Sequence, residues 1–414
     1  MSDGLTTMLR NNRLSLGPWV YVLAGAVAMG VAGTYQFVWS SIRPELGARL
    51  AVGEASLGTV FTLYIVAQTL SQFPAGWFRD RYGPRIPMLV GALLLAVGYA
   101  GTAVATSAGQ VAIAYTLGGI GGGAIYSVCI NTPIKWFTER RGLATGLVTM
   151  SFGGVSALFI PSIQSGLSTA YSATLLVCAV ATGVLTLLGA AIMRDPDTVA
   201  DDSEQQAPST TTKTTDGGSS SYGWRALIRT RQFWLLYVLL VVVNGVGLML
   251  VSKAVSFVAQ YGFPATVATV AASSVALADS AGVVTVGGLS DRIGRERTVV
   301  VTVTSSGLAI AVAVWAGTSG YAWVFVALLA IAAFFRSPVY SVIPALVGDY
   351  FGPERSSENY AVLYTAKVWG GIGGGLAASA LINAVGWSVV FLLGAVTMCG
   401  AGAISTYLSP PQVR

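Results

Sequence analysis

Histidine is absent from this sequence of 414 residues, and charged residues make up only 10% of it. Without histidine, the chain has no imidazole that could act as a base, a metal ligand or a proton relay. The three cysteines, Cys129, Cys178 and Cys399, lie far apart in apolar runs, so their spacing indicates neither a disulfide nor a metal site. An average soluble domain is about 25% charged. These scarcities argue against a water-soluble protein and against an enzyme, and we expect no cofactor and no metal.

The sequence consists largely of long hydrophobic stretches. Hydrophobic residues make up 54% of the chain, and 50 glycines add to them. This length accommodates about twelve spans of about 20 residues each. Stretches of spanning length lie at 17–39, 57–78, 86–105, 109–136, 142–165, 171–193, 232–254, 264–290, 298–317, 320–347, 359–384 and 386–408. An even number of spans places both termini on one side of a lipid bilayer.

The positive charges indicate which side that is. Of the 23 lysines and arginines, 18 lie in the termini and in the loops on the side of the termini, and only Arg43 and Arg49 lie in loops on the other side. Positive residues concentrate on the cytoplasmic side of membrane proteins. Both termini are therefore predicted to be cytoplasmic, and the net charge of +6 reflects membrane topology rather than binding to nucleic acid.

A polar segment divides the chain. Residues 195–222 are rich in acidic residues, Ser, Thr and Gly and have almost nothing apolar to bury, which predicts a disordered cytoplasmic linker. It separates an N-terminal six-helix bundle, residues 1–194, from a C-terminal six-helix bundle, residues 223–414.

A short motif repeats at half-chain spacing. The string GWFRDRYGPR begins at Gly76, and GGLSDRIGRER begins at Gly287, 211 residues later. The motif residues are Gly76, Asp80, Arg81, Gly83 and Arg85 in the first copy and Gly287, Asp291, Arg292 and Gly294 in the second. The two halves are thus versions of one unit.

This repeated loop resembles the signature loop of the major facilitator superfamily. Asp80 and Asp291 can each close a helix end and pair with arginines of neighbouring helices, forming a cytoplasmic gate latch. The alternative is that the loop is a plain topological anchor. The resemblance implies an all-α membrane protein with twelve transmembrane helices in two pseudo-symmetric six-helix bundles around a central cavity.

Three longer strings resemble one group within that superfamily. YGPRIPMLVG (82–91), IYSVCINTPIKWFTERRGLATG (125–146) and ENYAVLYTAKVWGGIGGG (358–375) are similar to the oxalate:formate antiporter and monocarboxylate transporter group. That resemblance implies a carrier of small organic carboxylates.

Few charges lie inside the predicted spans: Asp279 in span eight, Arg336 in span ten, Lys367 in span eleven and Lys253 near the end of span seven. A charge at mid-bilayer costs about 2.5–3.5 kcal/mol on insertion scales, so such residues face a wet cavity and are functional by default. Lys253 is the exception, because its position suggests that its stem extends to the interface.

The resemblance assigns roles to these charges. Lys367 matches the cavity lysine of the family, whereas Val283 stands where the family has an arginine in span eight. Arg336, in span ten, stands where relatives have a tryptophan, so we expect the cavity cation to have moved there. Arg336 is then the carboxylate anchor and Lys367 the movable charge. Asp279 is either a proton-coupling group or a permanent ion-pair partner.

Polar and aromatic side chains complete the predicted site. Tyr35, Gln36, Tyr126, Phe152 and Tyr340 match cavity-lining positions of the family, and Tyr364 is a further tyrosine within a span. All six are predicted to line the substrate pathway.

The sequence as a whole predicts a secondary carrier that works by alternating access in a prokaryotic plasma membrane, as a monomer. The preferred substrate is a small monocarboxylate such as lactate, pyruvate or acetate, carried with a proton. An oxalate:formate-like exchange of dicarboxylate for monocarboxylate is the alternative. A drug efflux pump and a non-transporting nutrient sensor rank lower, because the G-P-x-x-G-G string of drug–proton antiporters and a signalling domain are both missing.

Overall fold

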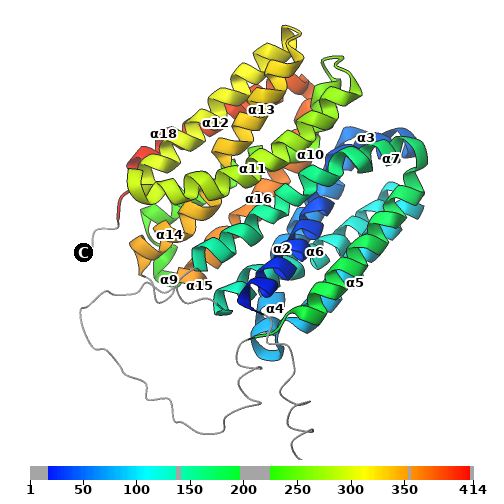
Figure 1. The fold of residues 1–414 in the computed structure, drawn as a ribbon. Coiled ribbons are helices and arrows are strands. Elements are labelled where there is room, and N and C mark those ends of the chain that lie inside the picture. The colour runs from blue at the N-terminus through cyan, green and yellow to red at the C-terminus, as the bar shows by residue number, and fades with distance from the viewer. Residues whose placement is uncertain (1–16, 137–140, 196–223, 353–355, 411–414) are drawn as a thin grey trace, which may run out of the picture.

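The computed structural model describes residues 17–136, 141–195, 224–352 and 356–410, and these residues are helical apart from short turns. Two helical bundles lie side by side, one from each half of the chain (Figure 1). The N-terminal bundle contains α2 (Pro18–Phe37), α3 (Trp39–Leu50), α4 (Glu54–Tyr82), α5 (Arg85–Val104), α6 (Ala108–Trp136) and α7 (Arg141–Ile192).

The C-terminal bundle has the same plan with more interruptions. It contains α9 (Trp224–Leu227), α10 (Arg231–Ala259), α11 (Ala265–Ile293), α12 (Arg295–Thr318), α13 (Ala322–Arg336), α14 (Val339–Phe351), α15 (Ser356–Tyr364), α16 (Ala366–Ile372), the π-helix η1 (Gly373–Ala377), α17 (Ala378–Val385), α18 (Trp387–Ile404) and the short 3-10 helix η2 (Ser405–Tyr407).

The predicted spans correspond to these helices. Within the described residues, ten helical stretches are long and apolar enough to cross a membrane. One of them, in α7, is bent at Ala170 and covers the two predicted spans 142–165 and 171–193. Helix α4 covers the predicted span 57–78, although it is not among the ten. The twelve-span interpretation is thereby consistent with the structure.

Two predicted boundaries need correction. The first span does not stop at residue 39, because α3 continues the path of α2 and buries Arg43, which the sequence suggested was in a loop. Asp195, the first residue of the predicted linker, is buried and bound by an arginine rather than disordered. The rest of that linker lies outside the described residues.

The repeated loop has the same backbone in both copies. Helix α4 ends at Gly83, with φ +79°, and α11 ends at Gly294, with φ +100°. Glycine adopts this left-handed region without the steric cost that a Cβ imposes. The sequence repeat therefore corresponds to a structural repeat, a sharp turn into the next helix.

Close helix packing places the central helices of each half. A Cβ on Gly33 of α2 would overlap the backbone of Phe152 on α7, and one on Gly123 of α6 would overlap Ser71 and Gln68 on α4. Small residues let membrane helices approach each other closely.

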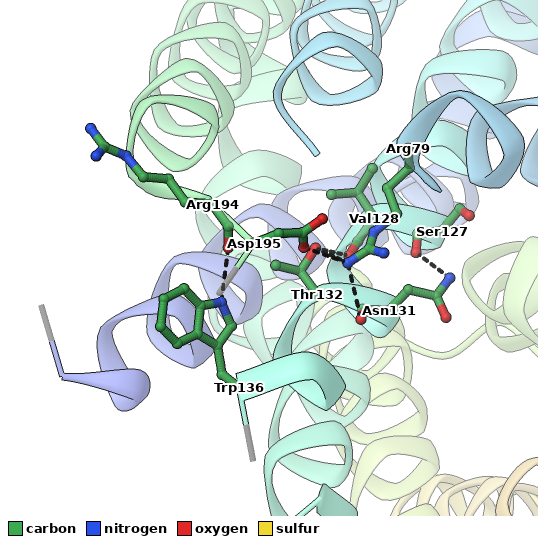
Figure 2. A network of polar contacts seen from close by, with 8 residues as sticks. All are labelled: Arg79, Ser127, Val128, Asn131, Thr132, Trp136, Arg194 and Asp195. Atoms are coloured by element: carbon green, nitrogen blue, oxygen red, sulfur yellow. Dashed lines mark hydrogen bonds and ion pairs between the residues drawn. The ribbon is translucent and has the colours of Figure 1, made fainter. Parts of the chain in front are cut away.

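We call the end of the molecule at which α2 begins and α18 finishes the terminal end, and the opposite end, where α3 lies, the far end (Figure 1). At the terminal end, buried Arg79 of α4 lies 2.9 Å from a carboxylate oxygen of Asp195, and it also donates to the carbonyl of Asn131 on α6 (Figure 2). Trp136 donates to the Arg194 carbonyl at 2.8 Å. These contacts fix the ends of α4, α6 and α7 to one another.

Candidate functional site

A cavity of about 70 Å³ lies between the two bundles. One water needs about 10–15 Å³, so this space suits a ligand of a few heavy atoms. The predicted site residues that line it are Gln36, Tyr126, Phe152, Asp279, Arg336, Tyr340, Tyr364 and Lys367. The structure thus brings together all three charges that the sequence placed in mid-membrane.

Arg336 and Asp279 form an ion pair within the C-terminal bundle. Arg336 is in the last turn of α13, just before Pro338 interrupts the span. Gly282 of α11 allows the pair to form, because a Cβ there would overlap the backbone at Phe334 on α13. Helix α11 therefore approaches α13 closely enough for Asp279, one turn earlier, to reach the guanidinium.

Two further polar groups hold the guanidinium in place. Arg336 donates to the hydroxyl of Tyr340 at 2.8 Å, and Tyr340 donates to the side-chain oxygen of Asn244 on α10 at 3.1 Å. Gly247, also on α10, leaves the space that the guanidinium fills, since a Cβ there would lie 2.6 Å from Cδ and Cζ of Arg336. Arg336 is consequently held in a preformed position, with its charge balanced by Asp279.

Lys367 has a different kind of partner. Its Nζ donates to Oε1 of Gln68 at 2.9 Å, and Gln68 lies on α4 in the other bundle. The chain of bonds continues, because Gln68 donates to the Tyr64 hydroxyl at 2.8 Å, which in turn donates to Gln36 at 3.4 Å. The ammonium also lies 6.0 Å from the ring centre of Tyr126. Lys367 thus bridges the two bundles through a neutral amide.

The charges of the cavity do not cancel. Arg336 and Asp279 compensate each other, whereas no described ion pair includes Lys367. Lys367 is only 6% exposed, so its charge is held largely away from water. The cavity therefore has one net positive charge, which a single carboxylate would neutralise.

Tyr35 does not line the cavity, contrary to the sequence-based expectation. Its side chain is fully buried in the N-terminal bundle, with ring centres of Tyr99 and Tyr115 at 4.6 and 4.5 Å. Neighbouring residues on a helix point about 100° apart. Gln36 faces the cavity, and Tyr35 therefore faces the bundle interior.

Lys253 also departs from expectation. It does not extend to an interface, because it is 1% exposed and donates to the Ser379 hydroxyl at 2.7 Å.

The sequence did not single out Gln68, the hydrogen-bond partner of Lys367. The feature of the sequence that could have identified Gln68 is an amide side chain in an otherwise apolar span. Val283 and Arg336 line the same cavity, and the move of the cavity cation from span eight to span ten stays a prediction.

The gate motif is described only in part. The side chains of Asp80 and Asp291 lie outside the described residues, so the predicted latch stays a prediction. Arg81 stacks on the ring of Trp77 at 4.5 Å, and Arg85 donates to the Ala191 carbonyl at 3.4 Å. Arg292 is exposed at the end of α11.

The two glycines that begin the motif copies allow close packing. A Cβ on Gly76 would lie 3.2 Å from Oγ of Ser127, and one on Gly287 would overlap Ser341.

Comparison with known proteins decides the family. The model of the Major Facilitator Superfamily matches residues 21–269 and 239–414. The chain belongs to the major facilitator superfamily. Within it, the chain is 31% identical to the oxalate:formate antiporter of Oxalobacter formigenes, over 99% of this chain and 95% of that one. The uncharacterized MFS-type transporter YhjX of Escherichia coli is 25% identical over 84% of each chain. Human monocarboxylate transporter 11 is 25% identical over 43% of this chain and 38% of its own. This superfamily member is therefore a multi-pass membrane transporter of the oxalate:formate antiporter and monocarboxylate transporter group.

Proposed function

We propose that this transporter exchanges small carboxylate anions, a dicarboxylate such as oxalate for a monocarboxylate such as formate. The observation that carries the proposal is the single uncompensated charge of Lys367 in a small cavity between the bundles. The whole-chain similarity to an oxalate:formate antiporter supports it. This choice favours the second of the two functions that the sequence left open.

Exchange follows from the cost of burying charge. During alternating access, the central site passes through a state in which it is closed to both sides of the membrane. With no anion bound, closure buries the ammonium of Lys367 with only an amide as partner, and an uncompensated buried ion costs several kcal/mol. A bound monocarboxylate makes the site neutral. The loaded carrier therefore reorients readily and the unloaded carrier slowly, which is the kinetic basis of exchange.

A dicarboxylate needs a second cation. Arg336 is the candidate, since its planar fork can hold a carboxylate with two parallel hydrogen bonds. Binding would replace Asp279 by the substrate as the partner of Arg336, and a proton on the displaced Asp279 would keep the oxalate-loaded site neutral. Oxalate is then held between Arg336 and Lys367, and formate by Lys367 alone.

Proton-coupled monocarboxylate symport is the second candidate, and the position of Asp279 in the cavity wall favours it. Protonation of Asp279 would free Arg336 for substrate, and ionisation would restore the pair. In this scheme the proton and the anion move together.

Exchange and symport make opposite predictions in proteoliposomes. We expect uptake of labelled oxalate only into liposomes loaded with formate, oxalate or another small carboxylate. Uptake into unloaded liposomes, driven by an inward proton gradient and accompanied by internal acidification, would support symport instead. Lys367→Gln serves as the matched control that lacks the central charge. No carboxylate uptake under either condition would refute both candidates.

The remaining assignments complete the proposal. The positive-inside distribution supports cytoplasmic termini, so that the far end faces outward. We place the carrier in the plasma membrane of a prokaryotic cell, and we propose that it works as a monomer without cofactors. The polar lining residues Gln36, Tyr126, Tyr340 and Tyr364, together with Phe152, are proposed to contact the substrate.

A further inference from the structure

A second group of buried cations lies at the far end of the molecule, where the two bundles meet. Lys253 of α10 is 1% exposed and donates to Oγ of Ser379 on α17. Ser379 lies against the other bundle, because a Cβ on Gly58 of α4 would overlap its hydroxyl. The ammonium of Lys253 is therefore at the seam between the bundles.

Arg43 of α3 approaches the same seam from the other side. It is 1% exposed, forms an ion pair with Glu54 of its own bundle, and donates to Oγ of Ser256 on α10 at 3.1 Å. Its guanidinium also lies 5.6 Å from the ring centre of Trp387 on α18. Among the described residues, the counter-ion of Arg43 thus lies within the N-terminal bundle, and the groups that it contacts across the seam are neutral.

If the two bundles separate at the far end, the N-terminal bundle keeps a neutral ion pair and the C-terminal bundle keeps an unpaired cation. Arg43 and Glu54 leave together as a neutral pair, because both belong to the N-terminal bundle. Lys253 stays with Ser379, and no carboxylate pairs with Lys253 among the residues that the structure describes. The C-terminal bundle then exposes one uncompensated cation at the mouth of the pathway.

This cation is close to the central site. Lys253 is six residues along α10 from Gly247, which lies against the guanidinium of Arg336. At 1.5 Å per residue the axial separation is about 9 Å. That distance is about one Debye length at physiological salt, so an anion held at Lys253 also experiences the field of the cavity cations.

We propose that Lys253 is a second anion site, which captures small carboxylates at the far mouth and passes them to Arg336 and Lys367. The inference rests on the proposed function, since its ligand is the exchanged carboxylate. Clefts whose charge has one sign raise the local concentration of oppositely charged substrates and accelerate their association. In the structure, α3 and α4 lie against α10 and α17 at the far end and cover the site.

The test compares transport from the two faces of the membrane. KM for labelled oxalate and formate is measured in right-side-out and inside-out vesicles, at low and high ionic strength, for the wild type and Lys253→Gln. The substitution should raise KM at the far face about three- to tenfold, weaken its dependence on salt, and leave KM at the terminal face within about twofold. Lys253→Arg, which keeps the charge, should restore the far-face KM.

Arg49→Gln is the matched control, because Arg49 is an exposed far-end cation that stacks on Tyr171 at 4.5 Å, away from the seam. An equal effect from Arg49→Gln would overturn the inference in favour of general surface charge. Equal changes in KM at both faces, or a changed maximal rate alone, would overturn it in favour of gating. Normal exchange with an unchanged far-face KM refutes only the capture site. Absence of carboxylate transport by the wild type refutes the proposed function and the capture site with it.

Discussion

The net charge of the central cavity leads to a rescue experiment. Among the described residues that line the central cavity, Lys367 is the one uncompensated cation, because Arg336 is neutralised by Asp279, and Lys367→Gln removes it. The cavity charge falls from +1 to 0. A hydrogen bond to a charged group contributes about 1.5–3 kcal/mol, so binding of a monocarboxylate should weaken about 10- to 150-fold.

The second substitution should reverse that loss. In the double variant Lys367→Gln with Asp279→Asn, Arg336 loses its counter-ion and the cavity regains a charge of +1. Arg336 already points into the same cavity, so it can take over the carboxylate. We expect formate affinity to recover to within about tenfold of the wild type. Asp279→Asn alone makes the charge +2 and should shift preference towards the dianion.

Equilibrium binding of labelled formate and oxalate to the purified carrier measures these affinities without the complication of turnover. Each variant is first checked for a monodisperse profile and for thermal unfolding. A double variant that binds formate no more tightly than Lys367→Gln, while remaining folded, would refute the charge balance from which the site was argued.

Three further predictions follow from named contacts. Gln68→Glu gives Lys367 a permanent counter-ion, so formate binding should weaken about 10- to 100-fold, as checked by the same binding assay. Gly282→Leu should force α11 away from α13 and lower the free energy of unfolding by about 1–3 kcal/mol or more, seen as a lower Tm in detergent. Asp195→Asn replaces the charged partner of buried Arg79 by a neutral amide and should cost about 1–3 kcal/mol of stability with little effect on formate affinity; an unchanged Tm would contradict this assignment.

The membrane helices were readable in the sequence, because each must satisfy its own backbone hydrogen bonds and present apolar side chains over a fixed length. The repeated glycines at 83 and 294 were readable for a similar local reason, since both occupy a backbone conformation that other residues rarely adopt. The predicted end of the first span was wrong, because hydropathy assigns a charged residue such as Arg43 to a loop. The ion pair of Arg43 with Glu54 allows α3 to bury this charge.

The candidate site was readable as a set of residues, because charges are costly in a bilayer and therefore conspicuous. The sequence does not show which of the two cations Asp279 neutralises. Asp279 pairs with Arg336 rather than with Lys367 only because Gly282 brings α11 against α13. Gln68 joins Lys367 across 299 positions of sequence, and no local pattern marks that contact.

By itself, the sequence determined that this protein is a twofold-repeated helical membrane protein with very few buried charges, since span length, charge placement and turn glycines act over a few residues. Only the tertiary structure decided that Tyr35 faces a bundle interior, that Lys253 lies in a seam, and that Lys367 holds an uncompensated charge. Those outcomes depend on which helices approach each other closely, and that is fixed by packing between segments far apart in the chain.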